Sequence, residues 1–143
     1  MKLTHILAAA ALALAISTPA LAVSDKDADT FLLTPALFEK MKKAEPDLKA
    51  LNIKDQSDEE DSESTVDNII KTIDKHPKAK AVLAKHGLSA REVALASVAM
   101  IHAGMFVALE GQMDKKGAAD LMKSYTREQR ANIAFMRTVA NTR

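Results

Sequence analysis

The chain has 143 residues, carries 20 Lys and Arg residues against 19 Asp and Glu residues, and contains no cysteine. The absence of cysteine excludes disulfides, four-cysteine zinc sites and covalently attached c-type haem. Basic residues are scattered, and four Phe, one Tyr and no Trp leave few rings on which bases could stack. We therefore expect no nucleic-acid partner. The core must consist of Ala, Leu, Ile, Val and Met, a mixture that favours helices.

The first 22 residues have the three parts of a cleavable signal peptide. Lys2 gives the start a positive charge, residues 6–16 form an apolar run, and Ala20 and Ala22 follow a helix-breaking Pro19. The apolar run is about 11 residues, whereas a helix needs roughly 20 to span a bilayer. We expect cleavage after Ala22, which gives a periplasmic or secreted protein with no permanent membrane span.

The remaining chain reads as one helical domain with two polar interruptions. We expect residues 23–33 to be a flexible start of the mature protein, because the segment begins with charged and small residues. The helical domain then occupies residues 34–143. Within it, residues 52–63 are acidic and hold a single strongly apolar residue, Ile53, so they predict an acidic loop.

Capping side chains mark the starts of the predicted helices. Thr34, Ser64, Ser89 and Thr126 each stand where a hydroxyl can accept a hydrogen bond from the first helical turn. Pro46 lies inside the helix that begins after Thr34, so we expect that helix to bend or to divide in two.

Glycines mark the expected ends. Gly87 is placed to terminate a helix in the left-handed conformation that glycine adopts easily. Gly111 and Gly117 are expected to bracket a loop before the last two short amphipathic segments.

Residues 90–110 form the most apolar part of the mature chain, with no charged residue between Val93 and Leu109. A helix that is apolar on nearly every side is either the central helix of a domain or a membrane span. Amphipathic helices flank it and need a partner, so the central position is the favoured reading. The sequence therefore predicts an all-α protein, a single small bundle of five or six helices around a central apolar helix at about 90–110.

His102 is the one histidine within this apolar helix, and it is the candidate for chemistry. With Met105, one turn away, it could bind copper(I) or a haem iron. The alternative is a histidine at the edge of the core, hydrogen-bonded to Glu92, Glu110 or backbone. The sequence contains no nucleophile elbow, no phosphate-binding glycine loop and no paired metal-binding histidines, so we expect neither catalysis nor a bound cofactor.

Two stretches carry a resemblance. Residues 88–92, followed by the Ala-rich helix and by residues 132–135, look like a group of small exported helical proteins from Gram-negative bacteria. Residues 125–130, Tyr-Thr-Arg-Glu-Gln-Arg, are similar to the LTxxQ motif of periplasmic Spy/CpxP-type proteins, with Tyr in place of Leu and one copy instead of two. The first resemblance implies an exported all-helical protein, and the second implies a chaperone or stress role.

The function expected from the sequence is that of an exported, non-enzymatic helical protein. It would bind a protein partner or a small apolar ligand in the grooves between its amphipathic helices. The alternatives are a periplasmic metal- or haem-binding protein that uses His102 and Met105, and a Spy/CpxP-like chaperone.

Overall fold

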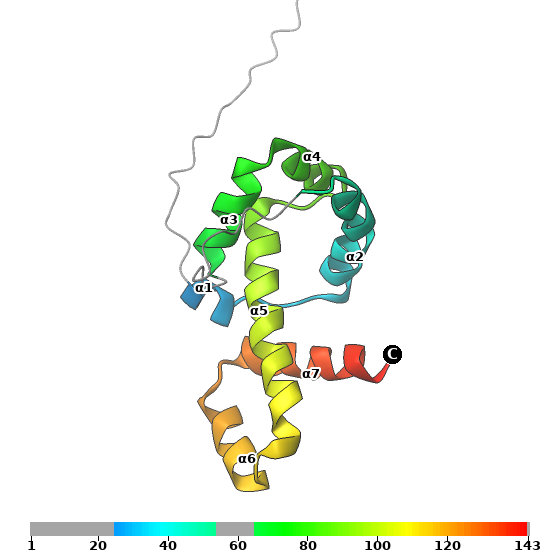
Figure 1. Ribbon diagram of the computed structural model, residues 1–143. Coiled ribbons are helices and arrows are strands. Elements are labelled where there is room, and N and C mark those ends of the chain that lie inside the picture. Colours follow the sequence, from blue (N-terminus) through cyan, green and yellow to red (C-terminus); the bar gives the residue numbers. More distant parts are fainter. Residues whose placement is uncertain (1–24, 54–64, 143) are drawn as a thin grey trace, which may run out of the picture.

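The computed structural model describes residues 25–53 and 65–142, and every regular element in these two stretches is helical. The all-α prediction is therefore confirmed, with seven α-helices in place of five or six, and one short 3₁₀ helix (Figure 1). The predicted signal peptide, 1–22, and most of the predicted acidic loop lie outside the described residues. The helices are α1 (Asp25–Asp29), α2 (Pro35–Ala50), α3 (Val66–Lys75), α4 (Pro77–Lys85), α5 (Ala90–Leu109), η1 (Glu110–Gln112), α6 (Lys115–Ser124) and α7 (Arg127–Asn141).

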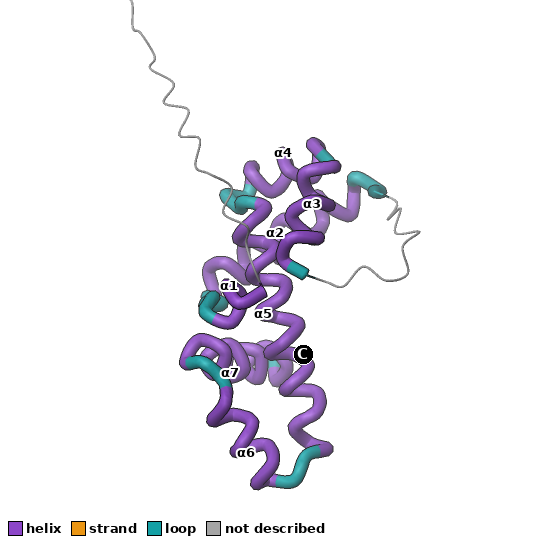
Figure 2. The backbone as a smooth tube through the Cα atoms, turned by 90° about the vertical axis from the view of Figure 1, so that its left-hand side faces the viewer, coloured by secondary structure: helices purple, strands orange, loops and turns teal. Residues whose placement is uncertain are grey.

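The central apolar helix is confirmed as α5, and the other helices are arranged around it. It packs against α1 and α3 near its start and against α7 further along, while α2 and α4 contact each other beside it. Figure 1 shows α1 to α4 grouped around the first half of α5, and α6 and α7 beside its second half. Figure 2 shows the same division from the side. In this view α7 crosses α5, and α6 lies beside the second half of α5.

The segment that precedes α2 packs against α5. Residues 25–33 form α1 and an extended stretch that packs on α5. Ala28 is 1% exposed and lies against Ala94 and Val98, and Leu33 is buried in a neighbouring cluster. The small side chain of Ala28 allows this polar helix to approach α5 closely, a contact that the composition of the segment did not predict.

The capping residues account for where most helices begin. Thr34, Ser89 and Thr126 cap α2, α5 and α7 as predicted, and the last two form full capping boxes. At α3 the hydroxyl that caps the helix belongs to Thr65 rather than Ser64. The expected loop before α6 is shorter than predicted, because Asp114 caps that helix and Gly117 lies within its first turn.

Gly87 ends α4 in the predicted way. Its φ is +67°, and its N–H donates to the Ala84 carbonyl while the N–H of Leu88 donates to the Leu83 carbonyl. These two bonds, with Leu83 and Leu88 in one buried cluster, form a Schellman motif. The motif turns the chain directly into the capping box of α5.

Pro46 neither divides α2 nor ends it at once. The helix continues through Pro46 to Ala50, and the chain then leaves it at Asn52, whose φ of 46° places it in the left-handed region. A proline one turn before the end of an exposed helix removes a single hydrogen bond, and four further helical residues compensate for it. Of the two expected outcomes, a bend or a division, the division is therefore wrong, whereas the bend stays a prediction.

Candidate ligand-binding sites

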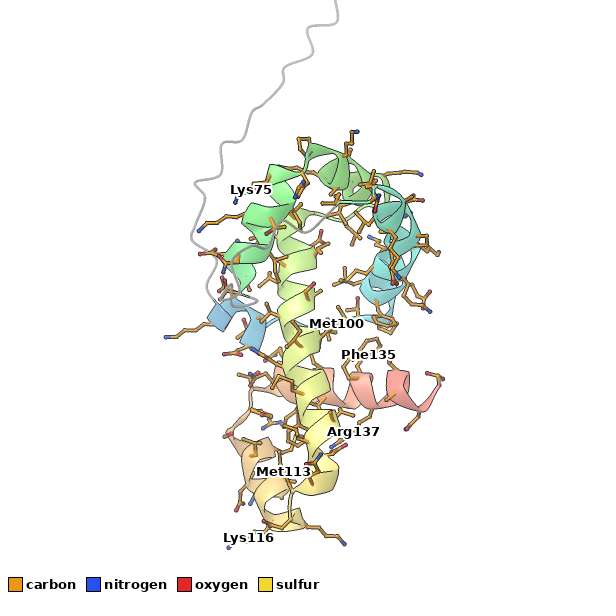
Figure 3. The ribbon with its side chains drawn as sticks, viewed as in Figure 1. Lys75, Met100, Met113, Lys116, Phe135 and Arg137 are labelled. Atoms are coloured by element: carbon orange, nitrogen blue, oxygen red, sulfur yellow. The ribbon has the colours of Figure 1, made fainter. Side chains whose placement is uncertain are left out.

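A cleft of about 750 Å³ lies between α2, α5 and α7. In Figure 3, Met100 on α5 and Phe135 on α7 lie in the space between these helices. Most of the lining side chains are apolar, and they come from all three helices and from α4. They include Phe38, Met41, Leu48, Leu83, Leu88, Val93, Met100, Phe135 and Val139.

An aromatic pair joins the two outer walls of this cleft. The rings of Phe38 on α2 and Phe135 on α7 meet edge to face, with centroids 5.5 Å apart and an angle of 82° between the planes. The ammonium group of Lys42 lies 5.9 Å from the Phe38 ring centroid. This pair is a direct contact between α2 and α7, the two helices that face each other across the cleft.

The charged side chains on the rim of the cleft form ion pairs with one another. Lys49 lies 2.6 Å from Glu45, and Lys42 lies 3.7 Å from Glu39, with every one of the four side chains more than half exposed. The hydrogen bond from Lys49 lowers the pKa of Glu45 below the ordinary value of a glutamate. Two cations and two anions on one rim give the cleft no preference for a charged ligand.

Asp47 holds the far wall of the cleft in place. Its Oδ2 atom lies 2.9 Å from Nε2 of His86 and 3.1 Å from Nζ of Lys85, and both partners stand at the end of α4. The hydrogen bond with His86, followed by that with Lys85, lowers the pKa of the Asp47 carboxyl. Lys40 adds a hydrogen bond of 3.4 Å to the Gly87 carbonyl, so α2 and the end of α4 form one wall.

A second, smaller pocket of about 320 Å³ lies between α1, α5 and the α6–α7 segment. Its apolar wall is formed mainly by α5 and by the first residues of α7. Met113, labelled in Figure 3, lies at the end near α6. The lining residues are Ala28, Asp29, Ala99, His102, Ala103, Met105, Phe106, Leu109, Met113, Leu121, Tyr125, Gln129, Asn132 and Ile133.

The two predicted site residues, His102 and Met105, both line this smaller pocket. Half of the His102 side chain is exposed, and Met105 is 58% exposed. The nearest charged partner of His102 is Asp29 of α1, with Nδ1 4.0 Å from Oδ1. Neither predicted hydrogen-bond partner serves this histidine, because Glu92 closes the capping box of α5 and Glu110 binds Arg137.

The stretch similar to the LTxxQ motif has a structural role. The Thr126 hydroxyl caps α7 and also donates to the backbone carbonyl of Asp29 at 2.5 Å. Gln129 completes the capping box and donates from Nε2 to Oδ1 of Asp29 at 2.7 Å. These bonds attach the start of α7 to α1 across about a hundred residues of sequence, whereas the chaperone role that the resemblance implies stays a prediction.

Asn132 has a structural role that the sequence did not reveal. It is 2% exposed, its Nδ2 donates to the Phe31 carbonyl at 2.7 Å, and its Oδ1 accepts from the Leu33 N–H at 2.8 Å. The side chain pairs with backbone as a neighbouring β-strand would, and it holds residues 31–33 against α7. A polar residue on the otherwise apolar face of the last helix was the available signal.

A row of apolar side chains on α5 remains uncovered. Ile101, Met105 and Leu109, spaced four residues apart, are 43%, 58% and 43% exposed. In its most apolar stretch, α5 is long and apolar enough to cross a membrane, and 39% of that stretch is buried. The helix is central to the fold without being enclosed along its whole length.

Across residues 25–53 and 65–142, no three His, Asp or Glu side chains lie close enough together to hold a metal ion. The metal or haem role of His102 and Met105 therefore stays a prediction that rests on two residues of one pocket. No protein-family model matches the chain, and no curated protein or solved structure is significantly similar to it.

Proposed function

We propose that this protein is an exported, non-enzymatic binding protein that takes an aliphatic chain into the cleft between α2, α5 and α7. The observation that carries the proposal is the cleft itself, about 750 Å³ lined mainly by apolar side chains from several helices. Pockets of roughly 300–1,000 Å³ with such linings are typical of small-molecule sites. A cleft of this size left empty would expose apolar surface to water at a free-energy cost.

The composition of the walls favours an unbranched aliphatic ligand. Met41 and Met100 are flexible and can adjust to chains of different length, and the small Ala44 leaves depth behind them. The paired charges of Lys42, Lys49 and their glutamate partners provide polar contacts for a head group without selecting its charge.

The first experiment tests whether the cleft is occupied. The protein is isolated after export, extracted with organic solvent, and the extract is examined by mass spectrometry for bound aliphatic compounds. The extracted protein is then titrated with a fluorescent fatty acid and displaced with saturated alcohols and acids of increasing chain length. We expect affinity to rise with chain length to a plateau and to depend little on the charge of the head group.

A matched pair of variants locates the binding. Val139→Phe places a ring in the cleft, whereas Ala140→Phe places the same ring on the exposed side of α7. We expect the first variant to weaken binding at least about tenfold and the second to change it less than about twofold. Equal effects of the two variants, or no binding by the native protein, would contradict the proposal.

Export is tested separately by determining the N-terminus of the protein recovered from the periplasm or the medium. The support for export is the sequence pattern of residues 1–22, and we expect the recovered chain to begin at Val23. A recovered chain that retains Met1 and stays with the membrane fraction would overturn this part of the proposal.

A metal or haem site is the second candidate function, favoured by the joint position of His102 and Met105 at the smaller pocket. The test is competition of the purified protein with a coloured copper(I) chelator and, separately, titration with haem, both followed by absorption spectroscopy. We expect a spectral change that Met105→Leu removes if this reading holds, and no change in either experiment would exclude it.

A further inference from the structure

The smaller pocket differs from the cleft in its charge. Of the residues that line it, Asp29 alone carries a formal charge when histidine is neutral, and neither lysine nor arginine is among them. The cleft, in contrast, has two acids and two bases on its rim. A lone carboxylate at an apolar pocket attracts a cation and repels an anion.

The Asp29 carboxylate is held in a defined position. Thr126 binds its backbone carbonyl, Gln129 binds its Oδ1 atom, and the preceding Ala28 is buried against α5. Within the described part of the chain, Oδ2 of Asp29 accepts no hydrogen bond. An oriented carboxylate with one oxygen still available can accept a hydrogen bond from a charged donor without reorganising first.

The rest of the pocket is shaped for an apolar body that includes a ring. Phe106 and Tyr125 meet edge to face with centroids 5.8 Å apart and provide an aromatic wall. The alanines at positions 99 and 103 leave space along α5, and Ile133 lies at the base of the pocket. Exposed Met105 and Leu109 form the entrance.

From these features we propose that the smaller pocket binds a small apolar amine, with its ammonium group on Asp29 and its hydrocarbon part against Phe106 and Tyr125. The ammonium donates to the available carboxylate oxygen, and the apolar part covers surface of α5 that the fold leaves open. This inference does not depend on what occupies the cleft between α2, α5 and α7, because the two cavities are lined by different side chains.

The test compares three probes of equal shape, phenylbutylamine, phenylbutanol and phenylbutyrate, by calorimetric titration of the exported protein. The titrations are run at about pH 8, above the range in which histidines usually titrate. We expect the amine to bind about tenfold more tightly than the alcohol, as a hydrogen bond to a charged group predicts, and the carboxylate to bind least. Equal affinities for the amine and the alcohol would overturn the proposal.

Two variants of α1 make the comparison specific. Asp29→Asn keeps the oxygen that accepts from Gln129 and removes the charge, so we expect amine and alcohol to bind equally. Asp27→Asn removes a similarly exposed carboxylate of the same helix that pairs with Arg91 and does not line the pocket. We expect it to change the preference less than about twofold, since exposed charges at a distance are screened. Equal effects of the two variants would show a general field effect and overturn the proposal.

An NMR measurement can show where the amine binds without the use of a variant. The side-chain amide of Gln129 donates to Asp29, so its NMR signals should shift when the amine binds and stay in place with the carboxylate. If Asp29→Asn does not fold, this signal and the amine-to-alcohol ratio of the native protein decide the matter. Binding of the amine without any shift of the Gln129 amide would place it elsewhere and contradict the assignment.

Discussion

The two halves of α5 have the same apolar character and very different surroundings. In the enclosed half, residues 90–100, five side chains are buried, namely Ala94, Leu95, Ala96, Val98 and Ala99. In the open half, residues 101–109, only Ala103 and Phe106 are buried, and a row of large apolar side chains faces outward. The difference arises because α1 to α4 surround the first half, whereas α6 and α7 cover one side of the second (Figure 1).

This contrast distinguishes the part of α5 that is packed inside the fold from the part that keeps apolar surface open to solvent. Buried side chains in the enclosed half contribute hydrophobic free energy with every neighbour in place. The open half keeps apolar surface in contact with water, which is the usual sign of an interaction site. The smaller pocket extends over this boundary, since Ala99 and residues of the open half line it, whereas the cleft is lined by Val93 and Met100 of the enclosed half.

The largest expected effect comes from one substitution made in both halves. Leu95 is 6% exposed and Leu109 is 43% exposed. We expect Leu95→Ala to lower the free energy of unfolding by about 3 kcal/mol, from lost burial and the cavity left behind. Leu109→Ala should lower it by less than about 1 kcal/mol. Urea unfolding measures both, and similar losses at the two positions would show that the halves are equally enclosed.

The next effect concerns the link between the chain start and α7. Asn132→Ala removes both hydrogen bonds of the side chain and leaves the buried N–H of Leu33 without its acceptor. We expect a loss of about 2 kcal/mol in the free energy of unfolding. Asn141→Ala, at an exposed position of the same helix, is the control and should change stability little. A neutral Asn132→Ala would mean that the N-terminal segment is held by apolar contacts alone.

Removing the capping box of α5 or of α7 should lower the free energy of unfolding by a smaller amount, and the two losses should differ. Ser89→Ala removes the cap of α5 at a cost of about 1 kcal/mol. Thr126→Ala removes the cap of α7 and also the bond to the Asp29 carbonyl, so it should cost more by a fraction of that value. Hydrogen exchange gives a second reading, because only Thr126→Ala should increase exchange in α1. Equal exchange in both variants would show that α1 does not depend on this contact.

The smallest expected effect is on the pH dependence of stability. It involves two carboxyl groups, Asp47 beside the enclosed half of α5 and Glu110 at the end of the open half. The hydrogen bond with His86 is the main cause that lowers the pKa of Asp47, and the hydrogen bond from Arg137 lowers the pKa of Glu110. A carboxyl whose folded pKa lies below its unfolded pKa adds stability above the unfolded value and loses it as pH falls through the folded value. Both side chains are partly exposed to solvent, which screens the interactions, so the contributions are small.

Asp47→Asn and Glu110→Gln should therefore reduce stability slightly at neutral pH and not at all in strong acid. Urea unfolding of each variant beside the native protein, from neutral pH down to below the ordinary range of carboxyl groups, measures this. A difference that grows as the pH falls would contradict the assigned direction of the pKa shifts.

The sequence by itself determined the local features of this protein. It predicted the all-α class, the apolar helix over about 90–110, the caps at Thr34, Ser89 and Thr126, and the helix end at Gly87. These features depend on hydrogen bonds and on the spacing of apolar residues over a few positions, so residues close in sequence are sufficient to recognise them.

Only the tertiary structure decided which side chains meet across the chain. Asp29 reaches Gln129, Asn132 reaches Leu33, and Phe38 meets Phe135, each pair separated by about a hundred residues. A helix that is apolar on every side gives no indication of which face its neighbours will cover. The open half of α5 and the two cavities therefore follow from how many helices pack around it, and the contacts that place them are long-range.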